Sequence, residues 1–464
     1  MTDRDTICAV STAPGTGGIA VIRVSGPRAV GICGGVFFPK KKGKSLDAQP
    51  PYTVCLGSII HKGELIDEAL ATVFRSPHSY TGEDTVEITC HGSHYIQQRI
   101  LMALTEEGCR MALPGEYTKR AFLGGKMDLS QAEAVADLIA STSAGMNRLA
   151  LSQMRGGFGM ELGRLRERLL DFASLIELEL DFGEEDVEFA DRLELERSAK
   201  EIERVIGSLA GSFSLGNVIK NGVPVAIVGQ TNAGKSTLLN LLLGDERAIV
   251  SDIHGTTRDA IEDTVSLGGV TFRFIDTAGI RETSDMIESL GIERTFRKIE
   301  QASIVLWVVD LTCPAGLVES LSTLIAPLLE GKKTILLFNK SDLLTGEELD
   351  AKRSLLPSVT ADRLYISAAQ AGDIDLLRRR LTEAAAIPAI NQGDIVVTNV
   401  RHYDALIRAQ ASIGRVIQGL AQNISGDFLS QDIRQCLHYI GEITGHITPG
   451  EILANIFDRF CIGK

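Results

Sequence analysis

One loop of eight residues constrains the fold of this chain more than any other feature. Gly229–Ser236 has the sequence GQTNAGKS, which the apolar run VPVAIV precedes and TLLNLLL follows. The first run is typical of a strand and the second of a helix, and this order of strand, glycine-containing loop and helix defines a phosphate-binding loop. The backbone N–H groups of Asn232–Ser236 and the helix N-terminus would surround phosphate groups. The sequence therefore predicts an α/β domain around this loop.

Apolar strand candidates alternate with helical segments across residues 223–385. They are VPVAIVG, VTFRFIDT, IVLWVVD, TILLFNK and RLYISA. This alternation predicts a mostly parallel sheet with helices on its faces. Residues 1–125 differ, because they are rich in glycine and in short β-like runs such as IAVIRVSG and TVEITCHG.

Two helical blocks flank the α/β unit. In each block, apolar residues recur at alternating spacings of four and three, which places one apolar stripe along a helix. The stripes are Phe158, Leu162, Leu165, Leu169, Phe172 and Ile176 in the first block, and Leu429, Ile433, Cys436, Ile440 and Ile443 in the second. Ser130–Glu133 (SQAE) and Thr448–Glu451 (TPGE) are predicted to begin two further helices, the first with a capping box.

We therefore expect a multidomain protein of α/β plus α class. Its domains would be an N-terminal α+β domain (1–125), a discontinuous helical domain (126–220 and 386–464) and an inserted Ras-like P-loop domain (221–385). A length of 464 residues suits such a division.

Three more elements follow the loop in a fixed order: GTTRD (255–259), DTAG (276–279) and NKSD (339–342). Lys235 is expected to neutralise the β- and γ-phosphates, and Ser236 to ligate Mg²⁺. Asp276 would support the metal, Thr256 or Thr257 would reach it from a mobile loop, and the Gly279 N–H would contact the γ-phosphate.

The NKSD element selects the base. The Asp342 carboxylate would accept hydrogen bonds from the ring N–H and the amino group of guanine, a donor pair that adenine lacks. The sequence thus predicts GTP hydrolysis. The residues expected to contact GTP are Gly229, Asn232, Ala233, Gly234, Lys235, Ser236, Thr237, Ser251, Asp252, Ile253, His254, Gly255, Thr256, Thr257, Asp276, Thr277, Ala278, Gly279, Asn339, Lys340, Asp342, Ser367, Ala368 and Ala369.

The residue after DTAG is Ile280, where many small GTPases have a glutamine that orients the attacking water. An isoleucine side chain forms no hydrogen bond, so another group must take this role. Arg258 and Arg281 are nearby in sequence, but neither is assigned as an arginine finger. A monovalent cation held partly by Asn232 is one substitute, and a purely structural Asn232 is the alternative.

Composition and charge exclude several classes of protein. The net charge of −13 argues against a strongly basic, sequence-independent nucleic-acid binder, although a local basic patch is compatible with it. No apolar run approaches the roughly 20 residues that span a bilayer, and the N-terminus has no signal-peptide pattern. The eight cysteines form no CxxC pair, which suits a cytoplasmic protein without a zinc site.

Beyond these elements, the chain resembles the MnmE (TrmE) family of tRNA-modification GTPases. The resemblance spans nearly the whole chain and is carried by DTICAVSTAPGTGGIAVIRVSG, SYTGEDTVEITCHG, LPGEYTKRAFLGGKMDLSQAEAVADLI and the terminal FCIGK. It implies an N-terminal domain that binds folate and forms a homodimer. It further implies GTP hydrolysis stimulated by K⁺ and by dimerisation of the G domains. That activity would serve the addition of an aminomethyl-type group at C5 of the wobble uridine of certain tRNAs, together with an FAD-dependent partner of MnmG (GidA) type.

The resemblance also implies roles for individual residues. Ser236 and Thr257 match Mg²⁺ ligands, Glu288 matches an acidic residue that orients water, and a tetrahydrofolate derivative would bind a further group of residues. Asn232, Ser251, Ile253 and Thr256 match the K⁺ site. Arg23, Glu87, Lys126 and Lys464 match the folate site.

Cys461 has three possible roles: a nucleophile, a residue that positions folate or the tRNA base, or an apolar residue packed behind Phe457 and Phe460. Two other functions compete with tRNA modification. One is a GTP-dependent switch for ribosome assembly without group-transfer chemistry, and the other is a folate-dependent carrier for which GTP is only regulatory.

Overall fold

The computed structural model describes most of the chain, and it divides the chain into two compact units. The described residues are 5–41, 43–182, 192–230, 232–244, 263–275, 297–314, 323, 325–353, 362–368, 370–386, 394–447, 453, 456–458, 460 and 462–463. The first unit comprises residues 1–136, 153–204 and 408–464, and the second comprises 137–152 and 205–407.

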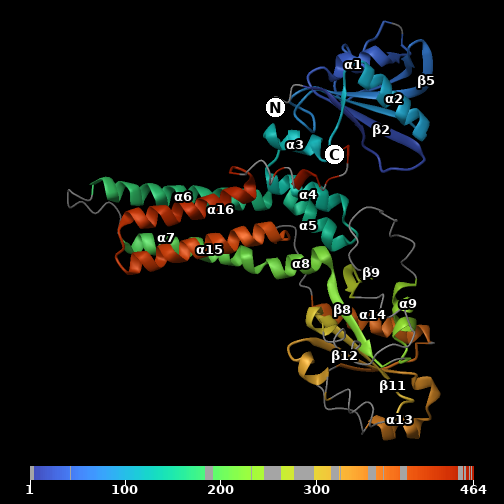
Figure 1. The fold of residues 1–464 in the computed structure, drawn as a ribbon, viewed down its shortest axis with the longest axis vertical. Helices are drawn as coiled ribbons and strands as arrows, with labels where there is room; N and C mark the ends of the chain where they lie inside the picture. Colours follow the sequence, from blue (N-terminus) through green and yellow to red (C-terminus); the bar gives the residue numbers. More distant parts are fainter. Residues whose placement is uncertain are drawn as a thin grey trace. The chain divides into compact units, whose positions relative to one another are not determined.

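A seven-stranded sheet forms the N-terminal part of the first unit, in the order β3-β4-β5-β6-β2-β1-β7 (Figure 1). The short strand β7 is parallel to β1, and all other neighbours are antiparallel. The strands are β1 (Ile7–Val10), β2 (Gly17–Ser25), β3 (Phe37–Pro39), β4 (Val54–His61), β5 (Glu64–Phe74), β6 (Thr85–Gly92) and β7 (Arg110–Met111).

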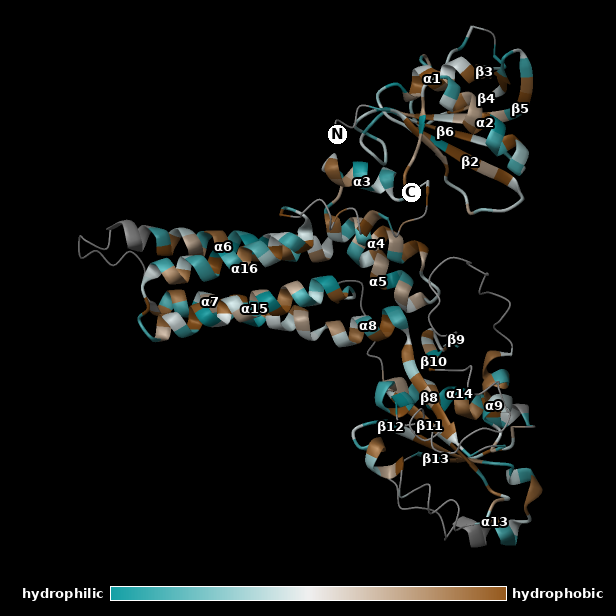
Figure 2. Ribbon diagram, in the orientation of Figure 1, coloured by the Kyte–Doolittle hydropathy of each residue, from teal (hydrophilic) through white to brown (hydrophobic). Residues whose placement is uncertain are grey.

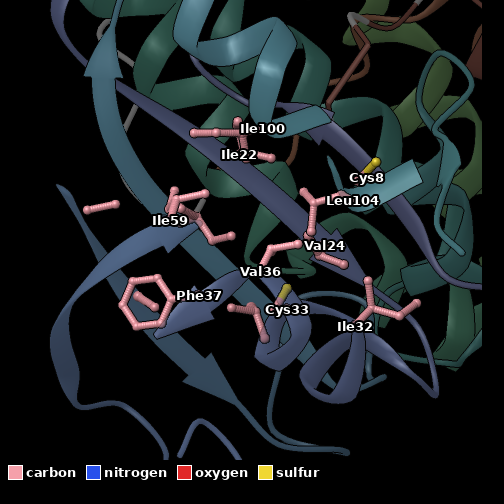
Figure 3. Packing of buried hydrophobic residues seen from close by; sticks show 14 of the residues in the cluster. Cys8, Ile22, Val24, Ile32, Cys33, Val36, Phe37, Ile59, Ile100 and Leu104 are labelled. Atoms are coloured by element: carbon pink, nitrogen blue, oxygen red, sulfur yellow. The ribbon is translucent and has the colours of Figure 1, made fainter. Parts of the chain in front are cut away.

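Helices α1 (Ala29–Val36) and α2 (His94–Glu106) cover one face of this sheet. Alternate residues of β2, such as Ile22 and Val24, join the apolar side chains of both helices in one core (Figure 3). Because side chains along a strand alternate between faces, Arg23 lies on the face opposite to α1 and α2.

Both predicted apolar stripes of the helical blocks are confirmed. Every residue of the two stripes is buried, and helices α6 (Gly157–Phe182) and α16 (Gly426–Thr444) pack against each other. Each helix also carries polar residues along its length (Figure 2). The other described helices of these blocks are α4 (Leu129–Ile139), α5 (Ala144–Met154), α7 (Arg192–Gly211), α8 (Phe213–Asn221) and α15 (Val400–Ala421), while α3 (Glu116–Leu123) precedes the first block.

The capping box predicted for Ser130 and Glu133 is wrong by two residues. Helix α4 begins at Leu129, and the reciprocal bonds join Asp128 and Gln131: the Gln131 N–H donates to Asp128 Oδ1 (2.8 Å), and the Asp128 N–H donates to Gln131 Oε1 (2.9 Å). Ser130 Oγ also donates to Asp128 Oδ1 (2.7 Å). The Asp128 carboxylate accepts the bonds from both the Gln131 N–H and the Ser130 hydroxyl. Asp128, and not Ser130, is therefore the N-cap residue.

The second unit contains the predicted, mostly parallel α/β sheet, in the order β13-β12-β11-β8-β10-β9. Only β9, an edge strand that the sequence did not indicate, is antiparallel to its neighbour among the described strands. The strands are β8 (Val223–Gly229), β9 (Asp263–Leu267), β10 (Val270–Phe274), β11 (Ile304–Asp310), β12 (Lys333–Asn339) and β13 (Asp362–Tyr365).

Separate apolar cores form on the two faces of this sheet. Val225 and Ile227 of β8 pack with helices α9 (Lys235–Leu243) and α14 (Ala371–Ala385) on one face, while Ala226 and Val228 face the other core. The unit also contains the short helices η2 (Ala326–Leu329), η3 (Ser341–Leu343) and α13 (Gly346–Arg353). The helix start predicted at Thr448–Glu451 lies outside the described residues. Among the described helices, none has both the length and the apolar composition needed to cross a membrane.

Candidate functional sites

The glycine-containing loop joins the end of β8 to the start of α9, as predicted. Three of its residues have positive φ angles: Gly229 (146°), Asn232 (62°) and Gly234 (97°). The two glycines also lack room for a side chain. A Cβ on Gly229 would lie 2.1 Å from the Val308 carbonyl oxygen, and one on Gly234 would lie 2.2 Å from Asn339 Nδ2. The close approach of neighbouring strand ends therefore requires both glycines, and asparagine is one of the few other residues that adopt this backbone conformation.

Lys235 occupies the first position of α9, and its side chain turns back over the loop. Its Nζ donates to the Gly229 carbonyl oxygen (2.8 Å) and to that of Gln230. Burial lowers the pKa of the Lys235 ammonium to about 8, and the positive charge of Lys298 adds to this effect. An anionic ligand at the loop would compensate both causes, so this lysine is suited to bind phosphate.

Asn339, at the end of β12, connects the phosphate-binding loop to the segment after β13. The side chain is 2% exposed; its Nδ2 donates to the Ala233 carbonyl oxygen (2.8 Å), and its Oδ1 accepts from the Ala368 N–H (3.0 Å). The Ser367 N–H donates to Asp373 Oδ2 (2.7 Å). The structure thus brings together the phosphate-binding loop, the end of β12 and the segment after β13, although Asn339 lies 106 residues from Ala233 and 29 from Ala368.

Sequence reasoning missed Asp310, the last residue of β11. It pairs with Lys340 of the NKSD element (2.6 Å) and accepts hydrogen bonds from the N–H and Oγ1 of Thr312 (2.8 and 2.6 Å). Burial opposes its charge, but the bonds from Lys340 and Thr312 prevail and lower the pKa of this carboxyl. The sequence signal that could have identified Asp310 is its position at the end of the apolar run IVLWVVD. The carboxyl ends of the parallel strands form the edge of the sheet where the other site residues lie.

Gly234→Ala should lower the affinity for GTP by about tenfold to a hundredfold. The added methyl group collides with Asn339, and the positive φ alone costs alanine about 1–3 kcal/mol. Titration with a fluorescent GTP analogue measures the effect. Gly414→Ala in α15 is the matched control, because nothing lies within 4 Å of its new Cβ; equal affinities for the two variants would contradict the proposed role of Gly234.

Several predicted site residues lie outside the described part of the chain. This group includes the switch segments, the acidic residue expected to orient water and two C-terminal residues. They are Ser251, Asp252, Ile253, His254, Gly255, Thr256, Thr257, Asp276, Thr277, Ala278, Gly279, Glu288, Ala369, Cys461 and Lys464. Asp342 lies in η3, which directly follows β12 and Lys340.

Arg23 and Glu87, predicted for the folate site, lie opposite each other on β2 and β6. Arg23 Nε and Nη2 donate to Glu87 Oε1 (2.9 and 2.8 Å). The Arg23 guanidinium also lies 5.5 Å from the ring centroid of Tyr80 and 5.6 Å from that of Tyr117. Lys126 contacts the loop that carries Tyr80, since its Nζ donates to the Pro77 carbonyl oxygen (2.8 Å).

The C-terminal segment reaches the same sheet. Ile462 forms a β-bridge with Pro114, and Ser11 Oγ donates to the Gly463 carbonyl oxygen (3.0 Å). Gly463 has φ 98° and approaches Val10 so closely that a Cβ would lie 2.1 Å from its carbonyl oxygen. Strand β1 pairs Ala9 with Arg23, so the chain end lies beside the strand next to the candidate folate residues.

The motif PGEYTKRAF forms most of α3, which is hydrogen-bonded to the N-terminal segment, to the loop before β6 and to strand β2. Arg120, 5% exposed, donates to the Asp5 carboxylate (2.6 Å) and carbonyl oxygen (2.9 Å), to Glu116 (3.0 Å) and to Glu83 (3.2 Å). The Tyr117 hydroxyl donates to the Arg23 carbonyl oxygen (2.7 Å). The motif therefore positions the strand that carries Arg23, a role that its sequence did not indicate.

A phosphate-binding loop, a buried asparagine linked to it and an NKSD element at the carboxyl edge of a parallel sheet define a P-loop GTPase. The MnmE helical domain family matches residues 129–461, and the family of GTP-binding protein TrmE N-termini matches residues 6–126. The chain therefore belongs to the MnmE (TrmE) family of tRNA modification GTPases.

Individual relatives match over the full length. The proteins named tRNA modification GTPase MnmE from Bacteroides fragilis and Bacteroides thetaiotaomicron are 61% and 60% identical to this chain, with all of both chains aligned. That from Parabacteroides distasonis is 60% identical over 99% of this chain and all of its own. Among solved structures, Era in complex with MgGDPNP and a 16S ribosomal RNA segment aligns with 41% of this chain and 66% of its own, at 28% identity and a TM-score of 0.27.

Proposed function

We propose that this chain uses GTP hydrolysis to install an aminomethyl-type group at C5 of the wobble uridine of certain tRNAs, together with an FAD-dependent partner of MnmG type. The observation that carries the proposal is the arrangement of the N-terminal sheet. Arg23, Glu87 and the loop contacted by Lys126 lie close together, and residues 462–463 contact Pro114 and Ser11, near strand β1, which pairs with the strand of Arg23. Full-length relatives named tRNA modification GTPase MnmE support the same function.

The donor set on this sheet fits a tetrahydrofolate derivative. A pterin ring presents N–H groups that a carboxylate such as Glu87 accepts, and a glutamyl tail presents carboxylates to Arg23, Lys126 and Lys464. The partly exposed ring of Tyr80 beside Arg23 adds a flat apolar surface for an aromatic ligand. Bound folate would supply a one-carbon unit. Cys461 would position the folate or the base, or act as a nucleophile.

In the G domain, the chain's own groups orient and stabilise the triphosphate. Lys235 and the loop N–H groups would bind the phosphates, Ser236 and Thr257 would hold Mg²⁺, and Asp342 would bind guanine. K⁺ would be held by Asn232 with the carbonyl oxygens of Ser251, Ile253 and Thr256. These cations supply positive charge to the phosphates as charge develops on them. Glu288 orients the attacking water in place of the glutamine that Ile280 replaces.

Hydrolysis is proposed to accompany dimerisation of the G domains in a homodimer held by the N-terminal domains, in the cytoplasm. The domain boundaries proposed for this cycle are 1–125, 126–220 with 386–464, and 221–385. Insertion of the G domain into the helical domain gives it two covalent connections, through which a change in the G domain reaches both helical segments.

Mass spectrometry of tRNA nucleosides from cells that lack this gene tests the proposal. We expect the C5-substituted wobble uridines to disappear and to return when the gene is restored. Unchanged nucleosides together with abnormal ribosomal subunits would contradict the proposal and favour a ribosome-assembly switch. Restoration by a Lys235→Met chain would show that GTP hydrolysis is only regulatory.

A further inference from the structure

A lysine-rich loop on the N-terminal domain contrasts with the acidity of the whole chain. Residues 40–49 (KKKGKSLDAQ) contain four lysines and one aspartate, in a chain of net charge −13. Lys40 pairs with Glu68 (2.7 Å), whereas Lys41 and Lys44 are exposed and make no ion pair with a described residue. These two lysines therefore present positive charge that no carboxylate among the described residues neutralises.

Buried contacts hold this loop in place. Leu46 is 1% exposed and belongs to the core of the N-terminal sheet. Arg75 Nη2 donates to the Asp47 carbonyl oxygen (2.9 Å), and the Lys44 N–H donates to the Lys41 carbonyl oxygen (3.2 Å). An ordered backbone reduces the entropy that a ligand must overcome when it binds the lysines.

Tyr52, at the end of the loop, adds an exposed aromatic ring. Its side chain is 60% exposed, although its hydroxyl donates to the His78 carbonyl oxygen (2.7 Å) and its ring contacts Phe74 edge-on at 5.8 Å. Its φ of 60° is uncommon for a bulky residue. Backbone strain of this kind concentrates at functional sites, and a fixed, exposed ring on the segment that follows a lysine-rich loop is suited to stack an unpaired base.

The segment 75–80 connects this loop to the candidate folate residues. The His78 carbonyl oxygen accepts a hydrogen bond from the Tyr52 hydroxyl, and the Pro77 carbonyl oxygen accepts one from Lys126. The ring of Tyr80 contacts Arg23. A polymer bound along Lys41, Lys44 and Tyr52 would therefore extend toward the site where the one-carbon unit is proposed to be held.

We propose that Lys41, Lys44 and Tyr52 form the surface that binds the single-stranded anticodon loop of tRNA. The lysines contact backbone phosphates, and Tyr52 stacks an unpaired base. Sequence-tolerant binding of single-stranded RNA combines these two elements, cations for the backbone phosphates and an aromatic ring for a base. The inference rests on the proposed function, and it gives an acidic chain a local means of binding RNA.

Fluorescence anisotropy with the full-length protein and a labelled tRNA transcript tests this surface. K41Q/K44Q should bind about tenfold more weakly than the wild type, and its log–log salt slope should be smaller by about 1.4, the value for two phosphate contacts on a single strand. The control K62Q/K200Q removes two exposed lysines from elsewhere in the same unit and should keep the wild-type affinity. Tyr52→Leu should bind about tenfold more weakly, whereas Tyr52→Phe keeps the ring and should bind normally.

The midpoint of urea unfolding, followed by far-UV circular dichroism, should be unchanged in all four variants, which establishes that their N-terminal domain folds. Wild-type affinity and salt slope in K41Q/K44Q would overturn the proposal, and so would an equal loss in the control. Normal RNA binding with lost binding of an acidic protein would also overturn it. If the wild type bound no tRNA, the proposed function would be wrong. If the wild type bound tRNA and K41Q/K44Q and Tyr52→Leu bound it equally well, only the assignment of the binding surface would be wrong.

Discussion

Lys235→Met should lower the rate of GTP hydrolysis by about 10²- to 10³-fold, as expected for the loss of one group that stabilises developing charge. Methionine keeps the length of the side chain but removes the ammonium that lies over the phosphate-binding loop. Phosphate release at saturating GTP measures the effect. Lys332→Met is the matched control, because Lys332 Nζ also donates to two backbone carbonyl oxygens (2.7 and 2.8 Å) but belongs to no site element. A rate loss of similar size in both variants would show that the effect is structural.

The lowered pKa of Lys235 predicts that both the stability of the protein and the proton uptake on GTP binding depend on pH. Without nucleotide its pKa is about 8, below the ordinary 10.5, so the unfolded chain binds more protons between these values. The free energy of unfolding should therefore rise with pH across this window. Bound phosphates raise the pKa, so GTP binding near pH 8 should take up a fraction of a proton, and near pH 6 Lys235 should contribute none. Calorimetry in two buffers of different ionisation enthalpy measures the uptake; equal heats at pH 8 would contradict it.

Arg120→Met should destabilise the N-terminal sheet by about 3–5 kcal/mol, since it leaves the buried Glu116 carboxylate without one of its cationic partners. Arg164→Met removes a guanidinium that is 74% exposed beside Glu161 and should cost less than about 0.5 kcal/mol. Urea unfolding followed by far-UV circular dichroism measures the difference.

The only tryptophan of the chain, Trp307, provides an internal control for this experiment. It is buried in β11 of the second unit, so its fluorescence reports the unfolding of the G domain. Arg120→Met should shift the dichroism transition to lower urea and leave the Trp307 transition in place. A common shift of both transitions would mean that the two units unfold together and would contradict a local role for Arg120.

Local sequence patterns predicted the features that depend on neighbouring residues. The periodicity of the α6 and α16 stripes follows from the geometry of a single helix, and the phosphate-binding loop follows from one strand, one turn and one helix. The cap of α4 shows the limit of such patterns, because Asp128 and Ser130 both suit the position and the helix start decides between them.

Features that depend on distant contacts were not predictable. Asp310 acquires its role only when β11 and β12 pair, and Tyr117 acquires its role only when α3 packs beneath Arg23. Family resemblance alone indicated Arg23 and Glu87, whereas their direct bond requires the register of β2 against β6. The spacing of apolar residues along the chain does not reveal which distant residues will come into contact.

The contact between Ser11 and Gly463 joins residues 452 positions apart, and it has a consequence for synthesis of the chain. Ser11 is translated long before Gly463, so it gains this partner only after residues 462–463 have been synthesised. A chain that stops just before these residues would contain the phosphate-binding loop and the NKSD element. Termination before residue 462 would thus yield a fragment that has the nucleotide-binding elements but lacks the contact between Ser11 and Gly463.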